Sequence, residues 1–306
     1  MNEVEKPTPK DKEVLVRVQA ASINYGNLVL LKGEPKLARL AFGICKPKYV
    51  IPGGDISGKV EAVGENVRMF EIGDEVFGDL SSCGWGGFAE YVAVPESALA
   101  SKPKNISFEE AAAVPMAAVT ALQAIRNKGK LQPGQRVLIN GASGGVGTFA
   151  VQIAKALGAE VTGVVSTKHV PITQTIGADY VIDYIKEDFS KNPERYDLII
   201  AANGNHPISV YKRLLNPTGT FVAVGGSYNQ TFQALLLGPL YSMWSKQKMN
   251  SFLQRANQQD LIFIQQLIEE GKVHPIIDRI YSIDEIVEAF QYFEEGHSKG
   301  KVIITM

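Results

Sequence analysis

A glycine-rich turn is the part of the sequence best suited to bind a ligand. It lies in VLINGASGGVGTFAVQIAKALG, where an apolar strand leads into the turn and a helix follows. Gly141, Gly144 and Gly147 stand at three-residue spacing, with Gly145 beside them. Glycines let a backbone approach a pyrophosphate, and a helix N-terminus directs its N–H groups at that charge. The turn therefore indicates a dinucleotide site, with a tight turn that binds nothing as the alternative.

The end of the next strand indicates which dinucleotide is bound. NAD-binding proteins place an acidic residue there, which accepts a hydrogen bond from the ribose 2′-hydroxyl. Ser166, Thr167, Lys168 and His169 occupy this stretch, and none of them is a carboxylate. Because hydroxyls and an ammonium bind a 2′-phosphate that a carboxylate would repel, the sequence favours NADPH. Tyr184, after the following strand, adds a hydroxyl. A solvated loop lysine and a packed tyrosine are the alternatives.

Two more turns follow apolar strands farther along the chain, AANGN and GGS. In an open α/β sheet, ligands bind beyond the carboxyl ends of the strands, so these turns are expected at the same edge. The predicted cofactor contacts from all of these turns are Gly141, Ser143, Gly144, Gly145, Val146, Gly147, Ser166, Thr167, Lys168, Tyr184, Asn203, Gly225, Gly226 and Ser227.

The elements that must position these turns change character along the chain. The first hundred residues hold short alternating strands between glycines, as in EVLVRVQAA and GKVEAVG, which predicts a β-rich domain. Ser107 and Glu110 form a capping box before one long helical run, SFEEAAAVPMAAVTALQAI. Strands and helices then alternate, which predicts a parallel sheet covered on both faces. We therefore expect an α/β domain at 108–257, inserted into a β-rich domain made of 1–107 and 258–306.

Composition excludes several classes of protein. The chain has 306 residues, of which 45% are hydrophobic and 21% charged, so it is expected to be globular rather than disordered. A net charge of −1 argues against a nucleic-acid partner. No apolar run is long enough for a membrane span. Two cysteines, Cys45 and Cys83, cannot form a disulfide framework, which predicts a cytoplasmic location.

Several segments together resemble the medium-chain dehydrogenase/reductase superfamily, and its zinc-independent quinone oxidoreductase branch in particular. They are INGASGGVGTFAVQIAKALGAEV, PGGDISGKVEAVGENV, GDEVFG, GGFAEYV and EEAAAVPMAAVTAL, and the resemblance covers nearly the whole chain. It implies a GroES-like catalytic domain in two segments around a Rossmann domain, with the active site in the cleft between them, and it implies a homodimer. It also implies an additional first strand that this chain, truncated or native, is expected to lack.

The resemblance also assigns residues to the reaction. Asn24 and Tyr25 match positions near the nicotinamide and the substrate carbonyl, where Asn24 can donate to an oxyanion and Tyr25 can donate a proton. A structural amide and a pocket wall are the alternatives. Thr120 matches a threonine near the nicotinamide ribose, or else packs within its helix. Lys299 and Lys301 are interpreted as surface charges rather than phosphate ligands.

The same comparison predicts that the chain binds no metal. The three positions that hold catalytic zinc in related alcohol dehydrogenases are Asn24, Gly54 and Met116 here. A carboxamide, a hydrogen and a thioether do not replace thiolate and imidazole as zinc ligands.

Without a metal, the site suits acceptors that spread the negative charge left by a hydride. The sequence therefore predicts an NADPH-dependent oxidoreductase that reduces a small lipophilic quinone or α,β-unsaturated carbonyl. A zinc-type alcohol dehydrogenase, or a nucleotide-binding sensor without turnover, are the alternatives.

Overall fold

The computed structural model describes residues 3–44, 46–243 and 245–306, so the expectation for Cys45 falls outside the described residues. The chain forms two compact units. The first contains residues 1–119, 255–270 and 275–306, and the second contains residues 120–254 and 271–274. No helix within the described ranges is long and apolar enough to cross a bilayer.

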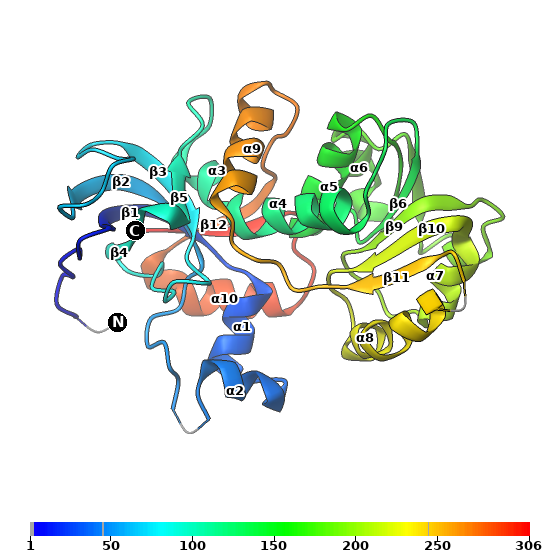
Figure 1. Ribbon diagram of the computed structural model, residues 1–306, viewed down its shortest axis with the longest axis horizontal. Coiled ribbons are helices and arrows are strands. Elements are labelled where there is room, and N and C mark those ends of the chain that lie inside the picture. The colour runs from blue at the N-terminus through cyan, green and yellow to red at the C-terminus, as the bar shows by residue number, and fades with distance from the viewer. Residues whose placement is uncertain (1–2, 45, 244) are drawn as a thin grey trace. The chain divides into compact units, whose positions relative to one another are not determined.

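A seven-stranded sheet forms the centre of the first unit (Figure 1). Its strands are β1 (Glu13–Ser22), β2 (Asp55–Val63), β3 (Glu75–Asp79), β4 (Tyr91–Pro95), β5 (Leu99–Ser101), β12 (Ile277–Ser282) and β13 (Lys301–Thr305). The order is β12-β13-β1-β2-β3-β5, and β4 also pairs with β1. The last strand therefore pairs directly with the first, which is why the two ends of the chain share one core.

The helices of the first unit are short. They are α1 (Tyr25–Lys32), α2 (Arg39–Phe42), α3 (Phe108–Ala112), α9 (Gln258–Glu269) and α10 (Ile286–Glu294), and α4 (Pro115–Leu122) crosses the division between the units. Ala289 of α10 and Val302 of β13 are fully buried in the same apolar core as Val14 and Val16. This core fixes the start of α1, where Asn24 lies.

The single helix expected after Ser107 is two helices, which corrects the prediction. The capping box is present, since the Glu110 N–H donates to Ser107 Oγ over 3.2 Å. However, α3 ends at Ala112 and α4 begins at Pro115. Proline lacks an N–H and disfavours a helical conformation in the residue before it, so the run is interrupted there.

A parallel sheet of six strands forms the second unit, in the order β11-β10-β9-β6-β7-β8. Its strands are β6 (Arg136–Asn140), β7 (Glu160–Val165), β8 (Tyr180–Asp183), β9 (Tyr196–Ala201), β10 (Leu215–Ala223) and β11 (Lys248–Ser251). Its helices are α5 (Gly145–Ala156), α6 (Val170–Thr175), α7 (Ile208–Leu214) and α8 (Tyr228–Met243). The order reverses between β6 and β9, which confirms the predicted doubly wound sheet and places its ligand-binding switch point there.

The domain limits predicted from the sequence stay a prediction. Residues 108–119 lie in the first unit, because α3 packs against β1 and β2, and its Ala112 shares a small buried cluster with Ala20 and Ile303.

Candidate active site

The glycine-rich turn lies at the switch point of the parallel sheet. Gly141 follows β6 with a φ of +85°, and a Cβ there would stand 2.7 Å from Cβ of Asn203, in the loop after β9. A Cβ on Gly147 would stand 2.0 Å from the carbonyl oxygen of Gly141. Gly144 is the N-cap of α5 and Gly145 its first residue. The backbone therefore turns tightly at the N-terminus of a helix, which is the arrangement that binds a pyrophosphate in dinucleotide sites.

The loops after β9 and β10 are tied to this turn through the backbone. The Asn203 N–H donates to the Asn140 carbonyl over 3.1 Å, and the Ser227 N–H donates to the Gly204 carbonyl over 2.9 Å. The Gly225 N–H donates to the carbonyl of Ala201 over 3.1 Å. Three of the predicted contact segments therefore form one connected edge.

A buried polar network beneath this edge was not predicted. Asn140 Nδ2 donates to the Tyr211 hydroxyl over 2.8 Å, and that hydroxyl donates to Gln230 Oε1 over 2.9 Å. Gln230 Nε2 in turn donates to the carbonyl of Gly225 over 3.2 Å. Burial raises the pKa of Tyr211 to about 12, so its hydroxyl stays protonated. The residues are far apart in sequence and on different elements, so no local motif indicates the network.

The residues predicted to bind the 2′ position of the cofactor, after β7 and β8, are at least partly exposed to solvent. Thr167, Lys168 and Tyr184 are exposed, and Ser166 is half-buried. Ser143 of the glycine-rich turn is linked to this loop, because its Oγ lies 2.9 Å from His169 Nδ1.

A carboxylate stands nearby that the sequence argument did not take into account. Asp183, at the end of β8, accepts a hydrogen bond from Thr167 Oγ1 over 2.7 Å and lies 3.5 Å from Lys186 Nζ. The Thr167 bond, chiefly, lowers the pKa of Asp183. The site therefore holds a charge that Lys186 and Lys168 must offset if a 2′-phosphate binds.

The remaining predicted cofactor residues lie in the same unit. Val146 belongs to the first turn of α5, Gly226 has a φ of +105° in the loop after β10, and Thr120 is buried in α4.

Asn24, in the first unit, is held on three sides. It is the N-cap of α1 and is only 7% exposed. Its backbone N–H donates to Asn27 Oδ1 over 2.7 Å. Its Nδ2 donates to Asp55 Oδ2 over 2.8 Å, and its Oδ1 accepts from Lys301 Nζ over 2.5 Å. The amide is thus clamped between a carboxylate and an ammonium, in the orientation that their donor and acceptor chemistry requires.

Lys301 is buried, which corrects the interpretation of it as a surface charge. It is 3% exposed in β13, and its Nζ lies 3.6 Å from Asp55 Oδ2. Lys301 is the first residue of β13, whose first four residues are all buried. Lys299 is half-buried. The sequence could not show this, because the partners of Lys301 come from the other end of the chain.

Asp55 is fully buried and has three hydrogen-bond donors besides the nearby ammonium. Ser22 Oγ and Asn24 Nδ2 donate to Oδ2, and the Met116 N–H donates to Oδ1. Burial, with a smaller contribution from Asp79 across the strand pair, raises the pKa of Asp55 to about 6, against the opposing effect of Lys301. Three donors and an ammonium face its two oxygens, so the side chain acts as an acceptor.

The wall beside Asn24 is aromatic and apolar. The Trp85 ring would be 3.1 Å from a Cβ on Gly26 and 3.3 Å from a Cβ on Gly54. Within the described ranges, the Trp85 Nε1 and Asn27 Nδ2 donors are buried without a hydrogen-bond partner. Tyr25, the first residue of α1, is 58% exposed.

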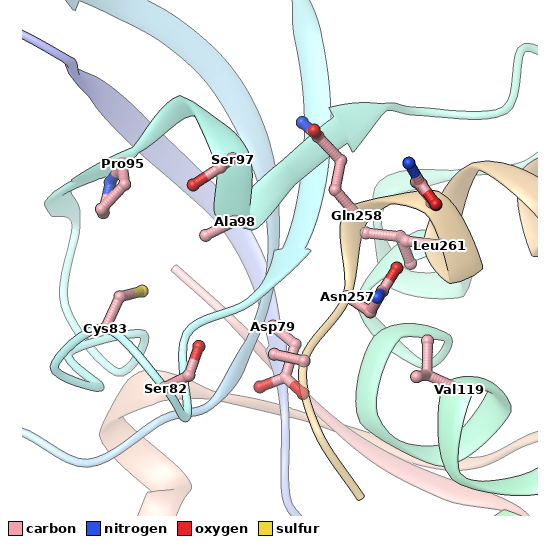
Figure 2. Close-up of a pocket in the computed structure, with 12 residues that line it drawn as sticks. Asp79, Ser82, Cys83, Pro95, Ser97, Ala98, Val119, Asn257, Gln258 and Leu261 are labelled. Carbon is pink, nitrogen blue, oxygen red and sulfur yellow. The ribbon is translucent and has the colours of Figure 1, made fainter. Parts of the chain in front are cut away.

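A cavity of about 470 Å³ opens in the same unit (Figure 2). Its lining residues are Asp79, Ser82, Cys83, Pro95, Ser97, Ala98, Val119, Ala256, Asn257, Gln258, Gln259 and Leu261. Asp79 pairs across the sheet with Asp55, so this cavity adjoins the strand beside β2, whose Asp55 accepts the hydrogen bond from Asn24 Nδ2. Its lining mixes polar and apolar side chains.

Two family models match the chain. The alcohol dehydrogenase GroES-like domain matches residues 10–104, and the zinc-binding dehydrogenase domain matches residues 176–304. The first match confirms the predicted GroES-like character of the β-rich unit.

The residues present do not fit the zinc that the second description implies. A Cβ on Gly54 would already meet Met116 Cε at 3.1 Å and the Trp85 ring at 3.3 Å, so no ligand side chain has room at that position. Asn24 is engaged on both sides by Asp55 and Lys301, and an ammonium beside it would repel a cation. In the described parts of the chain, no group of three or more His, Cys, Asp or Glu is placed to hold a metal.

Relatives match this chain over almost its full length. The chain is 32% identical to the chloroplast envelope quinone oxidoreductase homolog of Arabidopsis thaliana, over 99% of this chain and 92% of that protein. It is 30% identical to the chloroplastic NADPH-dependent alkenal/one oxidoreductase of the same plant, over 97% and 73%. The solved quinone oxidoreductase of Coxiella burnetii superposes with a TM-score of 0.87 at 29% identity, over 99% of this chain and 93% of that one. The chain belongs to the medium-chain dehydrogenase/reductase superfamily, in its quinone oxidoreductase-like branch.

Proposed function

We propose that the protein is an NADPH-dependent, zinc-independent reductase of small lipophilic quinones or α,β-unsaturated carbonyls. The observation that carries the proposal is the Asn24 amide, fixed between Asp55 and Lys301 where the related zinc enzymes carry a metal ligand. The names of the relatives, a quinone oxidoreductase homolog and an alkenal/one oxidoreductase, support the same class of acceptor.

The chemistry divides between coenzyme and chain. Bound NADPH supplies the hydride, which adds to an electrophilic carbon of the acceptor and leaves negative charge on the acceptor oxygen. Asn24 has a second Nδ2–H beyond the one given to Asp55, and this N–H donates to that oxygen. Conjugation spreads the remaining charge, so no Lewis acid is needed. A proton from water or from the Tyr25 hydroxyl completes the reduction.

The preference for NADPH rests on the loops after β7 and β8. Ser166, Thr167 and Tyr184 offer hydroxyl groups, and Lys168 offers an exposed ammonium. The Asp183 carboxylate is already engaged by Thr167 and Lys186. These hydroxyls and the Lys168 ammonium are the groups that we propose to bind a 2′-phosphate.

Assembly as a homodimer is part of the proposal. Strand β11 is an edge of the parallel sheet, and α8 beside it exposes a row of large apolar side chains. These are Phe232, Leu235, Leu236, Leu240 and Met243. An apolar helix next to a free strand edge is a surface that a second copy can cover.

The cytoplasmic location predicted from the two cysteines is also part of the proposal, and imaging of the tagged full chain tests it.

The experiment for the proposed function follows NADPH absorbance with a panel of quinones and enones. We expect acceptor-dependent oxidation with at least one conjugated acceptor. NADPH binding without oxidation by any acceptor would instead identify a nucleotide sensor.

A further inference from the structure

We infer that Lys301 is a positioning residue for the reaction: its buried ammonium holds the Asn24 amide so that an N–H, and not the carbonyl oxygen, is presented to the acceptor. The inference rests on the proposed function, because it assigns how the oxyanion donor of that reaction is oriented.

The ammonium of Lys301 donates two hydrogen bonds and forms one ion pair. Nζ lies 2.5 Å from Asn24 Oδ1, 3.3 Å from the Ile23 carbonyl and 3.6 Å from Asp55 Oδ2. An ammonium donates three hydrogen bonds and accepts none. Both hydrogen bonds of the side chain go to Ile23 and Asn24, at the start of α1, and the ion pair goes to Asp55, which also holds Asn24.

These contacts decide which way the Asn24 amide faces. The atom beside Lys301 must be the oxygen, because an ammonium cannot accept a hydrogen bond. The atom beside Asp55 must be the nitrogen, because an ionised carboxylate cannot donate one. With both ends fixed, one Nδ2–H is used by Asp55 and the other remains for the acceptor. Rotation of the amide would instead present an oxygen to a developing oxyanion, which repels it.

The charges also strengthen the donor. A cation at the amide oxygen favours the charge-separated form of the amide, which leaves more positive charge on the N–H groups. In a buried setting, where water screens weakly, this polarisation acts most on the charge that develops in the transition state. We therefore expect Lys301 to act on kcat more than on KM.

Stability alone is a poor reason for such an arrangement. Replacing a buried ion pair with apolar side chains is often neutral or stabilising.

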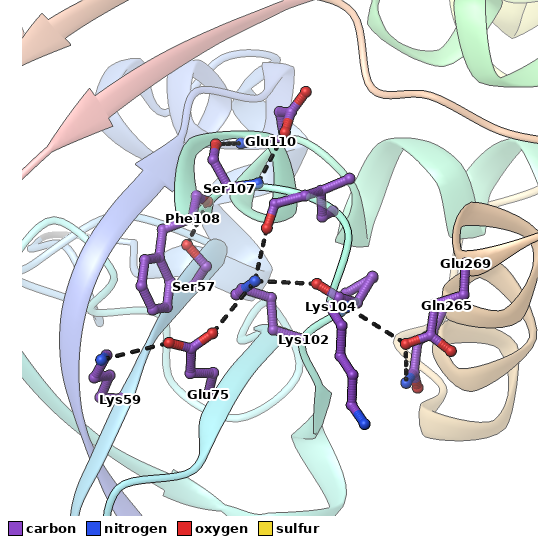
Figure 3. A network of polar contacts seen from close by, with 12 residues as sticks. Ser57, Lys59, Glu75, Lys102, Lys104, Ser107, Phe108, Glu110, Gln265 and Glu269 are labelled. Atoms are coloured by element: carbon purple, nitrogen blue, oxygen red, sulfur yellow. Dashed lines mark hydrogen bonds and ion pairs between the residues drawn. The ribbon is translucent and has the colours of Figure 1, made fainter. Parts of the chain in front are cut away.

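The first unit contains a second buried lysine, Lys102, which serves as a control for the loss of a buried ammonium. Lys102 donates to the carbonyls of Pro103 and Ile106 and lies 3.3 Å from Glu75, and none of these contacts involves Asn24 or Asp55 (Figure 3).

A double-mutant cycle tests the inference. The variants are Asn24→Ala, Lys301→Met and the combination, with Lys102→Met as the matched control in both backgrounds. Lys301→Met alone should lower kcat about 10- to 100-fold with little change in KM, as loss of one oriented oxyanion donor does. In the Asn24→Ala background the same change should alter kcat less than about 2-fold, because its effect passes through Asn24. Lys102→Met should leave kcat unchanged and show no coupling to Asn24.

The outcomes separate this inference from the proposed function. If the unsubstituted protein fails to oxidise NADPH whichever quinone or enone is supplied, the proposed function is refuted. Turnover with additive effects of the two substitutions, or a Lys301→Met variant as fast as the unsubstituted enzyme, overturns the role of Lys301 alone. If Lys301→Met does not fold, Lys301→Met/Asp55→Asn removes both charges together and takes its place in the cycle. The unsubstituted protein gives a further readout, since a buried ammonium that donates to Asn24 Oδ1 and to the Ile23 carbonyl gives a slowly exchanging ¹H–¹⁵N signal, and the absence of that signal contradicts the inference.

Discussion

Gly141 has a φ of +85°, in the left-handed region, and packs closely against Asn203 in the loop after β9. We predict that Gly141→Ala destabilises the fold by about 1–3 kcal/mol, because the new Cβ is strained by its φ and meets Asn203. NADPH should also bind more weakly, since the turn must shift. Gly134→Ala is the control, because Gly134 has a φ of +80° but no atom within 4 Å of the added Cβ. Thermal melts and coenzyme titration compare the two, and equal coenzyme affinity in both variants would contradict the assignment.

Cys83 lines the cavity of the first unit, yet it is expected to be unreactive. Burial, reinforced by the charges of Asp79 and Glu13, raises the pKa of its thiol to about 12. A thiol is the nucleophile only when ionised, so native protein carrying Cys45→Ser should resist alkylation at pH 8. Mass spectrometry should show labelling only after unfolding. Rapid labelling of the native variant would mean that the thiolate is stabilised.

Lys168 is the residue expected to distinguish the coenzymes. Lys168→Ala should weaken NADPH binding about 10-fold and leave NADH binding unchanged, since it removes one charge-assisted contact to the 2′-phosphate. Lys191→Ala is the matched control, because Lys191 is an exposed lysine of the same unit that pairs with Asp188. Equal losses for both coenzymes would remove Lys168 from the phosphate site.

At the scale of elements, the glycine-rich strand–turn–helix was predictable because all its signals are local. The same holds for the capping box at Ser107. The break at Pro115 was missed because an alanine-rich run outweighed one proline in the pattern. Asp55 and Lys301 were missed because their partners come from strands that meet only in the folded unit, and a lysine near a chain end looks solvated in the sequence.

The network under the coenzyme edge joins elements that are distant in sequence. Tyr211→Phe should cost about 1–3 kcal/mol, because Asn140 and Gln230 lose their shared hydroxyl partner in a buried place. It should also weaken NADPH binding by loosening the loops after β9 and β10. Tyr196→Phe is the control, because Tyr196 begins β9, at the opposite end of the strand from the network, and its hydroxyl hydrogen-bonds with Thr162 of β7. Unfolding and coenzyme titrations separate the effects, and an unchanged coenzyme affinity in Tyr211→Phe would show that the network only stabilises the fold.

For the whole molecule, the sequence predicted the interrupted architecture because both chain ends lack the βα alternation of the middle. The sequence left open how the exposed apolar residues of α8 are covered.

If α8 is a dimer surface, Leu236→Glu should yield monomers in sedimentation experiments, because a charge cannot be buried there unpaired. Val287→Glu, which changes an exposed apolar residue of α10, should leave the assembly unchanged. A Leu236→Glu variant that sediments like the unsubstituted chain contradicts the dimer surface.

The central claim is hydride transfer from NADPH to a conjugated acceptor without a metal. Its most direct test measures NADPH oxidation and metal content on the same chelator-treated sample, with an enone and its saturated ketone side by side. We predict full activity toward the enone, none toward the ketone, and far less than one zinc per chain. Stoichiometric zinc whose removal abolishes turnover, or equal reduction of the saturated ketone, would contradict the account.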